Sequence, residues 1–371
     1  MTKFVVVEGR TLKQAMKIIS AIVERYNTIP ILSHAKITHR AEGLRITGTD
    51  LDIEAHIDLD VVDGGGGDWS VCIGVQALAG IARAAGVMDV RIERADNAME
   101  ARISVGDGAA FYELQILPED DFPEIGGKQG DLIEMFTNGM LTATLDKVSG
   151  SISTEETRYY LNGVCWHITK QDRRFVATDG HRLSLCTYTP EGGEPASRII
   201  PRKTVKIISN HLANQNLKIY DVDTGKLDIV APGITIRTKL IDGTYPDYSR
   251  VLPSRHDFTL DLKRDEIIAA IDQATATGGQ RGAAIKFSNQ NGRAVIERRS
   301  GDFGNAKVKT STPWPAGKVE PQPFAFNSRY LRDVAAGCQG AIEMRMTEPG
   351  APFSIFDEDK TMTRVLMPMR A

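Results

Sequence analysis

Apolar residues recur every three or four positions in six segments of the chain, which is the spacing of amphipathic helices. Three segments share one pattern, and its apolar positions are Leu12, Met16 and Ile19, then Leu141, Leu145 and Val148, then Ile267, Ile271 and Ala274. The other three share a second pattern, marked by Leu78, Val205 and Leu331. Pro201 is expected at the first helical position of one segment, and Asn327 or Ser328 as the N-cap of another.

Between these segments, apolar and polar residues alternate as they do in half-buried strands. Two strand regions carry the same Thr-Asp pair, and Asp50 and Asp179 stand 129 residues apart (179 − 50). Two others end in an aromatic-Pro-acid turn, with Pro123 and Pro246 separated by 123 residues (246 − 123). The shared period is about a third of the chain, so the sequence predicts three copies of one α+β unit.

Turn-rich sequence near Gly127 and Pro253 suggests where the copies meet. The predicted domains are therefore residues 1–127 at the N-terminus, 128–253 in the centre and 254–371 at the C-terminus. Each is expected to contain two helices and many short strands.

The composition is that of a soluble globular protein, with 42% hydrophobic and 25% charged residues and a formal net charge of −3. The four cysteines are scattered, which fits buried thiols in a reducing compartment better than a disulfide framework or a zinc site. The N-terminus does not resemble a signal peptide. We expect a cytoplasmic protein.

Catalytic motifs are missing from the sequence: no phosphate-binding loop, no HExxH and no GxSxG stretch occurs. Asp179 and His181 stand two residues apart, so in a strand their side chains would share one face, but no credible nucleophile lies near them. Asp50 and Asp52 form a DxD pair that is more simply a solvated strand face. We expect no catalytic residue, no metal ligand and no cofactor.

Basic residues gather on the predicted helices although the whole chain is slightly acidic. The residues expected to meet phosphates are Lys13, Lys17, Arg25, Arg83, Arg202, Lys203 and Lys206. Repetition of this pattern from one predicted unit to the next favours a surface that faces nucleic acid.

Four motifs resemble one known family. They are "TRYYLNG" (Thr157 to Gly163), "VATDGHRL" (Val176 to Leu183), "YPDYSRVLP" (Tyr245 to Pro253) and the terminal "VLMPMR" (Val365 to Arg370). In this order, and together with the triple repeat, they resemble the β subunits of bacterial DNA polymerase III, the sliding clamps. The resemblance covers essentially the full length of the chain.

The resemblance implies a clamp fold of three domains, each with two helices and two antiparallel sheets, and a head-to-tail homodimeric ring around duplex DNA. It implies partners that carry a short clamp-binding peptide: the polymerase III α subunit, the clamp loader, and other polymerases and repair proteins. The implied peptide pocket consists of Leu161, Thr178, Gly180, His181, Arg182, Leu183, Pro246, Arg250, Val251, Tyr330, Val365, Met367, Pro368, Met369 and Arg370.

The same resemblance places Arg158, Tyr159 and Tyr160 in a loop that touches DNA. It places the dimer interface at Tyr112 and Leu114 of the first domain, opposite Ala274 and Thr275 of the third. The chain departs from the family in two ways. It ends in Ala371 where Leu is common, and its third-domain seam is smaller and more polar than usual.

Two other functions fit parts of the sequence. A metal-dependent DNA-processing enzyme would use the Asp50/Asp52 or Asp179/His181 groups. A protein-interaction scaffold that never meets DNA would use only the pocket.

Overall fold

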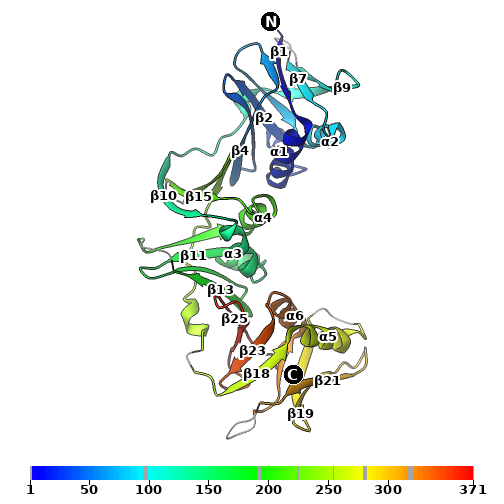
Figure 1. Cartoon of the computed structure of the whole chain (residues 1–371), viewed down its shortest axis with the longest axis vertical. Coiled ribbons are helices and arrows are strands. Elements are labelled where there is room, and N and C mark those ends of the chain that lie inside the picture. Colours follow the sequence, from blue (N-terminus) through cyan, green and yellow to red (C-terminus); the bar gives the residue numbers. More distant parts are fainter. Residues whose placement is uncertain are drawn as a thin grey trace. The chain divides into compact units, whose positions relative to one another are not determined.

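Each α-helix of the computed structural model begins within four residues of the end of a β-strand (Figure 1). The structure describes residues 2–94, 99–189, 194–223, 225–253, 255–278, 282–315 and 321–370. Within these ranges the α-helices are α1 (Gly9–Ile22), α2 (Val75–Ala85), α3 (Met140–Ser149), α4 (Arg202–His211), α5 (Arg264–Thr275) and α6 (Ser328–Ala336). Short 3-10 segments are η1 (Pro30–Ser33), η2 (Glu119–Asp121), η3 (Glu156–Leu161) and η4 (Tyr248–Val251).

All six helices coincide with the segments that the apolar spacing predicts, and their apolar faces are buried. Asn327 is the N-cap of α6, because its side-chain oxygen accepts hydrogen bonds from the backbone N–H groups of Arg329 and Tyr330 at 3.0 and 3.2 Å. The prediction for Pro201 is wrong by one position. Pro201 is the last residue of a strand that pairs with Gly163, and α4 begins at Arg202.

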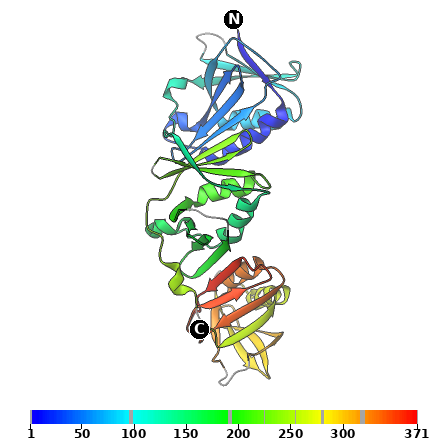
Figure 2. The same ribbon diagram turned by 60° about the vertical axis from the view of Figure 1, so that its left-hand side comes forward.

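One compact unit, here the N-terminal unit, consists of Met1–Ala143 and Lys203–Leu240. Its strands form one sheet in the order β10-β15-β16-β17-β4-β3-β2-β6-β9-β8-β7-β1-β5. In chain order these are β1 (Lys3–Val7), β2 (His34–Arg40), β3 (Gly43–Thr49), β4 (Ile53–Leu59), β5 (Asp63–Gly65), β6 (Trp69–Gly74), β7 (Val90–Arg94), β8 (Glu100–Val105), β9 (Ala110–Leu117), β10 (Gln129–Phe136), β15 (Leu217–Val222), β16 (Lys226–Ala231) and β17 (Ile234–Lys239). Helices α1 and α2 lie side by side, and α1 contacts β3 and β4 (Figures 1 and 2).

The second compact unit, here the C-terminal unit, consists of Thr144–Arg202 and Ile241–Ala371. Its larger sheet has the order β14-β11-β12-β13-β25-β24-β23-β18, and its smaller sheet β21-β20-β19-β22. The strands are β11 (Gly163–Ile168), β12 (Arg173–Thr178), β13 (Arg182–Tyr188), β14 (Ala196–Pro201), β18 (Phe258–Lys263), β19 (Ala284–Gln290), β20 (Arg293–Arg298), β21 (Ala306–Pro313), β22 (Phe324–Asn327), β23 (Ala341–Met346), β24 (Phe353–Phe356) and β25 (Met362–Leu366).

Every strand pair of the described residues, in both units, is antiparallel. Helices that cover antiparallel sheets make this an α+β protein, as the sequence predicts.

The two Thr-Asp pairs form the same hairpin turn. In the first turn (Thr49–Ile53) Asp50 Oδ1 accepts from the N–H groups of Asp52 and Ile53, at 3.0 and 2.7 Å. In the second turn (Thr178–Arg182) Asp179 Oδ1 accepts from the two corresponding N–H groups, at 2.9 and 3.0 Å. The threonine hydroxyl of each pair donates to the carbonyl four residues on, at 2.9 and 2.7 Å. The sequence repeat is thus a repeat of backbone geometry.

Each of these turns leads into a strand that pairs with a late strand of the same unit. After the first turn, β4 pairs with β17, and Ile53 lies opposite Thr238. After the second turn, β13 pairs with β25, and Arg182 lies opposite Leu366. The long-range pairing therefore occurs at the same position of the repeat in both units.

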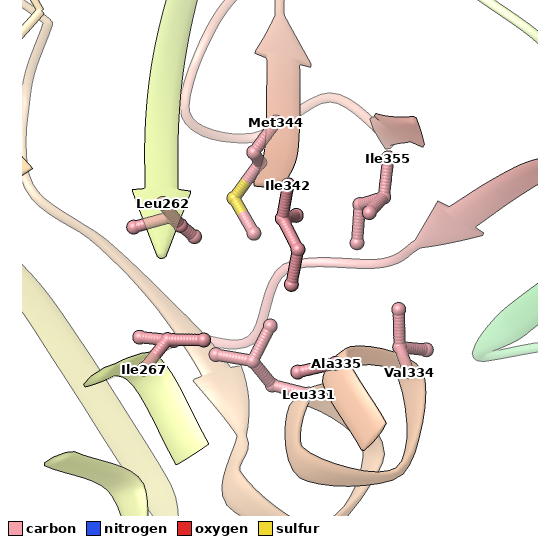
Figure 3. Close-up of a pocket in the computed structure, with 8 residues that line it drawn as sticks. All are labelled: Leu262, Ile267, Leu331, Val334, Ala335, Ile342, Met344 and Ile355. Atoms are coloured by element: carbon pink, nitrogen blue, oxygen red, sulfur yellow. The ribbon is translucent and has the colours of Figure 1, made fainter. Parts of the chain in front are cut away.

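The core between α5, α6 and the larger sheet of the C-terminal unit is closely packed. Figure 3 shows eight apolar side chains that point toward one another from these elements: Leu262, Ile267, Leu331, Val334, Ala335, Ile342, Met344 and Ile355. These side chains leave no room among them for a water molecule. Such packing stabilises the sheet and fixes α6 upon it.

No helix among the described residues is long and apolar enough to cross a membrane.

We predict that Leu331→Ala lowers the free energy of unfolding of the C-terminal unit by about 2–5 kcal/mol, because it opens a cavity in a core that has no free space. Urea unfolding followed by circular dichroism measures this loss. The matched control is Leu132→Ala, since Leu132 is 50% exposed on β10 and its truncation should change stability by less than about 0.5 kcal/mol. Equal effects of the two substitutions would contradict the assignment of the core.

Candidate functional site

The second Thr-Asp turn is where the sequence expectation about Asp179 and His181 fails. These residues do not lie in a strand with both side chains on one face; they form the turn between β12 and β13. Oδ1 of Asp179 accepts hydrogen bonds from the backbone N–H groups of His181 and Arg182. Gly180 adopts φ +88°, a left-handed conformation that glycine permits without strain. The aspartate is therefore a structural member of the turn.

An apolar pocket of about 230 Å³ opens beside this turn in the C-terminal unit. It is lined by Arg158, Tyr160, Leu161, Thr178, Gly180, Arg182, Leu183, Pro246, Asp247, Tyr248, Val251, Val365 and Met367. Segments far apart in the sequence meet here: η3, the second turn, η4 with the residues before it, and the end of the chain from β25 onward. Pairing of Leu183 with Val365 across β13 and β25 brings the last of these segments to the pocket.

Nine of the residues that the sequence assigned to a pocket line this one. They are Leu161, Thr178, Gly180, Arg182, Leu183, Pro246, Val251, Val365 and Met367. Their side chains are largely apolar, and Leu161, Leu183 and Val365 belong to one buried cluster that forms the floor.

The other six assigned residues are His181, Arg250, Tyr330, Pro368, Met369 and Arg370, and they lie outside this lining. His181 stacks on Tyr330, with ring centroids 5.8 Å apart and planes 22° apart. The His181 carbonyl accepts from the N–H of Met367 at 2.9 Å, and the Met369 N–H donates to Ala325 at 2.7 Å. Arg250 is exposed and pairs with Asp247 at 3.1 Å, and Arg370 is exposed. The expected effect of Ala371 falls outside the described residues.

Arg182 is the central charge of the site, and it is not free. Its side chain is only 9% exposed, and the guanidinium pairs with Asp179 at 3.1 Å and with Asp333 of α6 at 2.9 Å. It also lies 4.7 Å from the centre of the Tyr330 ring. Because removal of one partner would leave a buried charge uncompensated, this group fixes the second turn against α6. Arg182 therefore has a structural role in the pocket wall.

Four lining residues were missed from the sequence as pocket residues: Arg158, Tyr160, Asp247 and Tyr248. Arg158 and Tyr160 were assigned to DNA instead, yet both lie in the pocket wall. A Cβ added to Gly180 would come within 2.5 Å of Arg158 Nη1, so glycine makes room for this guanidinium. The sequence could have indicated these four residues, because they lie in the motifs "TRYYLNG" and "YPDYSRVLP", which also contain the pocket residues Leu161 and Pro246. Of the three residues assigned to the DNA-touching loop, Arg158, Tyr159 and Tyr160, Tyr159 is the one outside the pocket lining, and it is 55% exposed.

Tyr248 is held in the wall by a polar contact behind it. Its hydroxyl lies 2.8 Å from His167 Nδ1. Burial raises the pKa of Tyr248, whereas burial and the nearby Arg174 lower the pKa of His167. Both groups are therefore neutral near pH 7, which suits a pocket wall that receives apolar side chains.

A second cavity, the basic cavity, lies in the N-terminal unit and has a volume of about 350 Å³. It is lined by Lys13, Met16, Lys17, Ser20, Ala21, Ala79, Arg83 and His211, from α1, α2 and α4. Three of the cations expected to meet phosphate are thus brought together. No hydrogen bond or ion pair links Lys13, Lys17 or Arg83 to another residue in the described part of the chain.

Lys203 departs from the expectation for a free cation. Its ammonium group donates to Asp50 Oδ2 at 2.5 Å and to the Ile22 carbonyl at the end of α1 at 2.6 Å. It joins α4 to the first turn and satisfies a carbonyl that the helix end leaves unpaired. Arg202 and Lys206 of α4 are exposed, as is Arg25 beyond the end of α1.

The residues expected at a dimer seam have mixed surroundings. Tyr112 and Leu114 are half-buried on β9. Ala274 is 0% exposed inside the core that α5 covers, so its side chain cannot contact another subunit and that prediction is wrong. Thr275 is half-buried and bonds the Ile271 carbonyl of its own helix at 2.8 Å. The exposed apolar residue that the sequence reading missed is Phe111, also on β9 and 68% exposed.

The carboxylates proposed for a metal-dependent enzyme are engaged elsewhere. Asp50 pairs with Lys203 at 2.5 Å and Asp52 with Lys239 at 3.2 Å. In the residues that the structure describes, no group of three or more His, Cys, Asp or Glu side chains is arranged to hold a metal ion. All four cysteines are free and buried.

Comparison with known proteins agrees with this geometry. The model of the DNA polymerase III β subunit N-terminal domain matches residues 2–126, and that of the central domain matches residues 136–247. The β sliding clamp of Caulobacter vibrioides is 30% identical over 380 residues, covering 98% of this chain and 99% of that protein. The β sliding clamp of Pseudomonas aeruginosa is 26% identical over 374 residues, with coverages of 98% and 99%.

Solved structures show the same fold over the whole chain. The DnaN sliding clamp of Bartonella birtlesii, bound to griselimycin, superposes with a TM-score of 0.91 at 29% identity and covers 100% of both chains. The Caulobacter crescentus β sliding clamp, with polyethylene glycol at its proposed β-motif tethering region, gives a TM-score of 0.90 at 29% identity, covering 100% of this chain and 99% of that one. From this full-length similarity in sequence and fold, the chain belongs to the β sliding clamp family of DNA polymerase III β subunits.

Proposed function

We propose that this sliding clamp works as a closed ring of two chains that encircles duplex DNA and tethers the replicative polymerase to it through the apolar pocket. The observation that carries the proposal is the meeting of η3, the second turn, η4 and the chain end around one pocket, in a chain that belongs to the clamp family. The ring would act by topology, since a tethered polymerase that lets go of its template stays close to it.

Three equivalent domains, at residues 1–127, 128–253 and 254–371, are supported by the order of elements. Each of these ranges has an early strand followed by a helix and a later strand followed by a second helix. The family models that match residues 2–126 and 136–247 fall inside the first two ranges. The matching hydrogen bonds of the two Thr-Asp turns support equivalence of the first two domains at the level of single atoms.

The repeat also suggests how the ring closes. In both units, the strand that follows the Thr-Asp turn pairs with the last strand of the next domain: β4 with β17, and β13 with β25. In the third domain, the strand equivalent to β4 and β13 is β21. In the first domain, the last strand, equivalent to β17 and β25, is β9. In the described residues β21 pairs only with β20, and residues 110–115 of β9 pair only with β8. Two unpaired edges of matching type favour a heterologous contact that closes into a ring.

Equivalent positions give this seam a register. The pair next to each hairpin turn is Thr49 with Glu54, Thr178 with Leu183 and Arg298 with Ala306. Glu54 pairs in turn with Arg237 of β17. The equivalent turn residues Pro123 and Pro246 are 123 positions apart, so the residue of β9 equivalent to Arg237 is Leu114 (237 − 123).

Ala306 of one chain would therefore lie opposite Leu114 of the other, Lys307 opposite Glu113 and Val308 opposite Tyr112. The exposures agree with this register, because Ala306, Val308, Leu114 and Tyr112 are all half-buried on one face. Lys307 and Glu113 are exposed on the other, where opposite charges would attract. Ala306 and Val308 thus replace Ala274 as the third-domain side of the seam.

Duplex DNA would be held by the lining helices without base reading. Lys13, Lys17 and Arg83 of the basic cavity, with Arg25, Arg202 and Lys206, are the cations available to phosphates. Tyr159 is the exposed aromatic of the loop that the family uses near DNA. Few and weak phosphate contacts are appropriate, because a tightly bound ring could not slide.

The partners at the apolar pocket would be short peptides of the polymerase III α subunit, the clamp loader, and other polymerases and repair proteins. An apolar floor beside the neutral Tyr248 suits Leu and Phe side chains, and Met367 at the rim can adapt to several of them. Relatives of the same fold bind griselimycin or polyethylene glycol. We assign the clamp no catalytic step and no cofactor, and place it in the cytoplasm with the replication machinery.

The ring is tested by topology. With a clamp loader and ATP, the labelled protein should remain on nicked circular DNA through gel filtration in salt, and cutting the circle with a restriction enzyme should release it. Retention on the linear product would contradict encirclement, because an open end lets a ring slide off. Formation of shortened DNA in Mg²⁺ would instead support a nuclease.

The pocket is tested by Met367→Ala. We expect the variant to bind a fluorescent Leu/Phe-containing polymerase peptide about 5- to 100-fold more weakly, since a buried anchor contact is worth roughly 1–3 kcal/mol. Fluorescence anisotropy measures the affinity. Met135→Ala is the matched control, because Met135 is 54% exposed on β10 and outside the pocket. Unchanged affinity in the Met367 variant would refute the assignment.

The seam register is tested by exchanging charges. Lys307→Glu should place two carboxylates opposite each other and shift the dimer toward monomer in light scattering at micromolar concentration. Combining it with Glu113→Lys should restore the dimer. Lys218→Glu, on an exposed position of β15, should leave the dimer unchanged. A double variant as weak as the single one would rule out this register.

A further inference from the structure

The basic cavity contains a group that sliding along DNA does not by itself require. Besides its three cations it is lined by His211, the last residue of α4, which is half-buried. Among the described residues, the lining includes no acidic side chain. A histidine among lysines and an arginine is electrostatically unfavourable once protonated, unless an anion joins the group.

The shape of the cavity suits an anion larger than a halide. Lys13 and Lys17 are one turn apart on α1 and so project from one face of the helix. Arg83 approaches from the last turn of α2, and the small side chains of Ser20, Ala21 and Ala79 leave the space between open. The volume of about 350 Å³ leaves room for a group of several atoms such as a phosphate.

We propose that the basic cavity is a cradle for one phosphodiester group of the DNA backbone, and that His211 takes up a proton when the phosphate enters. This inference rests on the clamp function proposed above and names one contact of that function. Lys13, Lys17 and Arg83 provide the standing positive charge. His211 adds a further positive charge only while the phosphate is present, so binding of DNA and binding of a proton favour each other.

The direction of the proton coupling follows from the surroundings of His211. In the free protein, burial and the charge of Lys17 lower its pKa, so the imidazole is neutral at pH 7. The groups that face it are Lys13 and Lys17 of α1 and Arg83 of α2. A phosphate offsets this positive field, and the C-terminal end of α4 also favours a cation. The pKa of His211 is therefore higher with DNA than without, and affinity for DNA increases as pH falls between these two values.

The experiment uses the full chain labelled with 13C at the Cε1 atoms of histidine. The resonance of His211, assigned by its loss in His211→Gln, is titrated with acid in the free protein and with a 20-base-pair duplex at low salt. We expect the pKa of His211 to rise on addition of the duplex. His256 is the internal control, because burial and Arg345 lower its pKa in a similar way but it lies in the C-terminal unit, outside the cavity.

Affinity provides an independent readout. Between pH 7.5 and 5.5, duplex binding measured by anisotropy should strengthen about three- to tenfold more in the wild type than in His211→Gln, since a rise of about half a unit to one unit in the His211 pKa on binding is worth that factor. Lys17→Gln should reduce the slope of log affinity against log salt by about 0.9, the value for one phosphate contact. Lys218→Gln, on an exposed position of β15, should leave the slope unchanged.

Two outcomes would overturn the cradle. The first is a His211 pKa that the duplex leaves in place, with equal pH dependence in wild type and His211→Gln. The second is an equal rise of that pKa with inorganic phosphate at the same phosphate concentration, which would make the cavity a site for free anions. Neither outcome affects retention on circular DNA, so failure of the cradle is distinguishable from failure of the clamp function.

Discussion

The antiparallel pairing of β13 with β25 is the contact on which the candidate site depends. It aligns Arg182–Cys186 with Met362–Leu366, and so brings the end of the chain beside a turn that lies about 180 residues earlier. Without this pairing, Val365 and Met367 would be absent from the pocket, and Leu183 would lose its neighbour on the floor. The backbone hydrogen bonds of these two strands thus determine which side chains the end of the chain brings to the pocket.

The corresponding turn of the N-terminal unit has different side chains around it. Leu51 stands where the second turn has Gly180, and it adopts a positive φ of 77° although it is not glycine. Ile125 is buried there, and its N–H donates to Glu54 at 3.0 Å. Arg237 donates to the Ile125 carbonyl at 3.1 Å. The two Thr-Asp turns thus share their backbone hydrogen bonds but differ in the side chains around them.

Charge on the helices divides into groups that hold the fold and groups that remain available. Lys203 joins α4 to the first turn, and Lys147 of α3 pairs with Asp359 at 2.6 Å. Lys13, Lys17 and Arg83 have no such partner in the described residues and surround a cavity instead. Lys13, Lys17 and Arg83 therefore remain available to an anion, whereas Lys203 and Lys147 are occupied by carboxylates. A count of basic residues along the sequence cannot separate the two groups.

Much of the fold was determined by the sequence itself. Apolar spacing located all six helices, because the buried stripe of a helix has a period that survives in any tertiary context. The Thr-Asp pairs marked two equivalent turns, since the side chain of Asp satisfies nearby N–H groups through local geometry. Motifs also identified nine pocket residues, but only by resemblance to a family.

The tertiary structure alone decided which side chains were free. Ala274 has small and polar neighbours in the sequence, which suggested an exposed position, but it is fully buried because it lies on the face of α5 that packs on the core. Arg158, Tyr160 and Tyr248 joined the pocket, and Lys203 and Arg182 were engaged by distant carboxylates. These outcomes depend on contacts between residues up to 181 positions apart, as for Lys203 and Ile22. Local sequence patterns do not encode such contacts, because they arise only when the strands have paired.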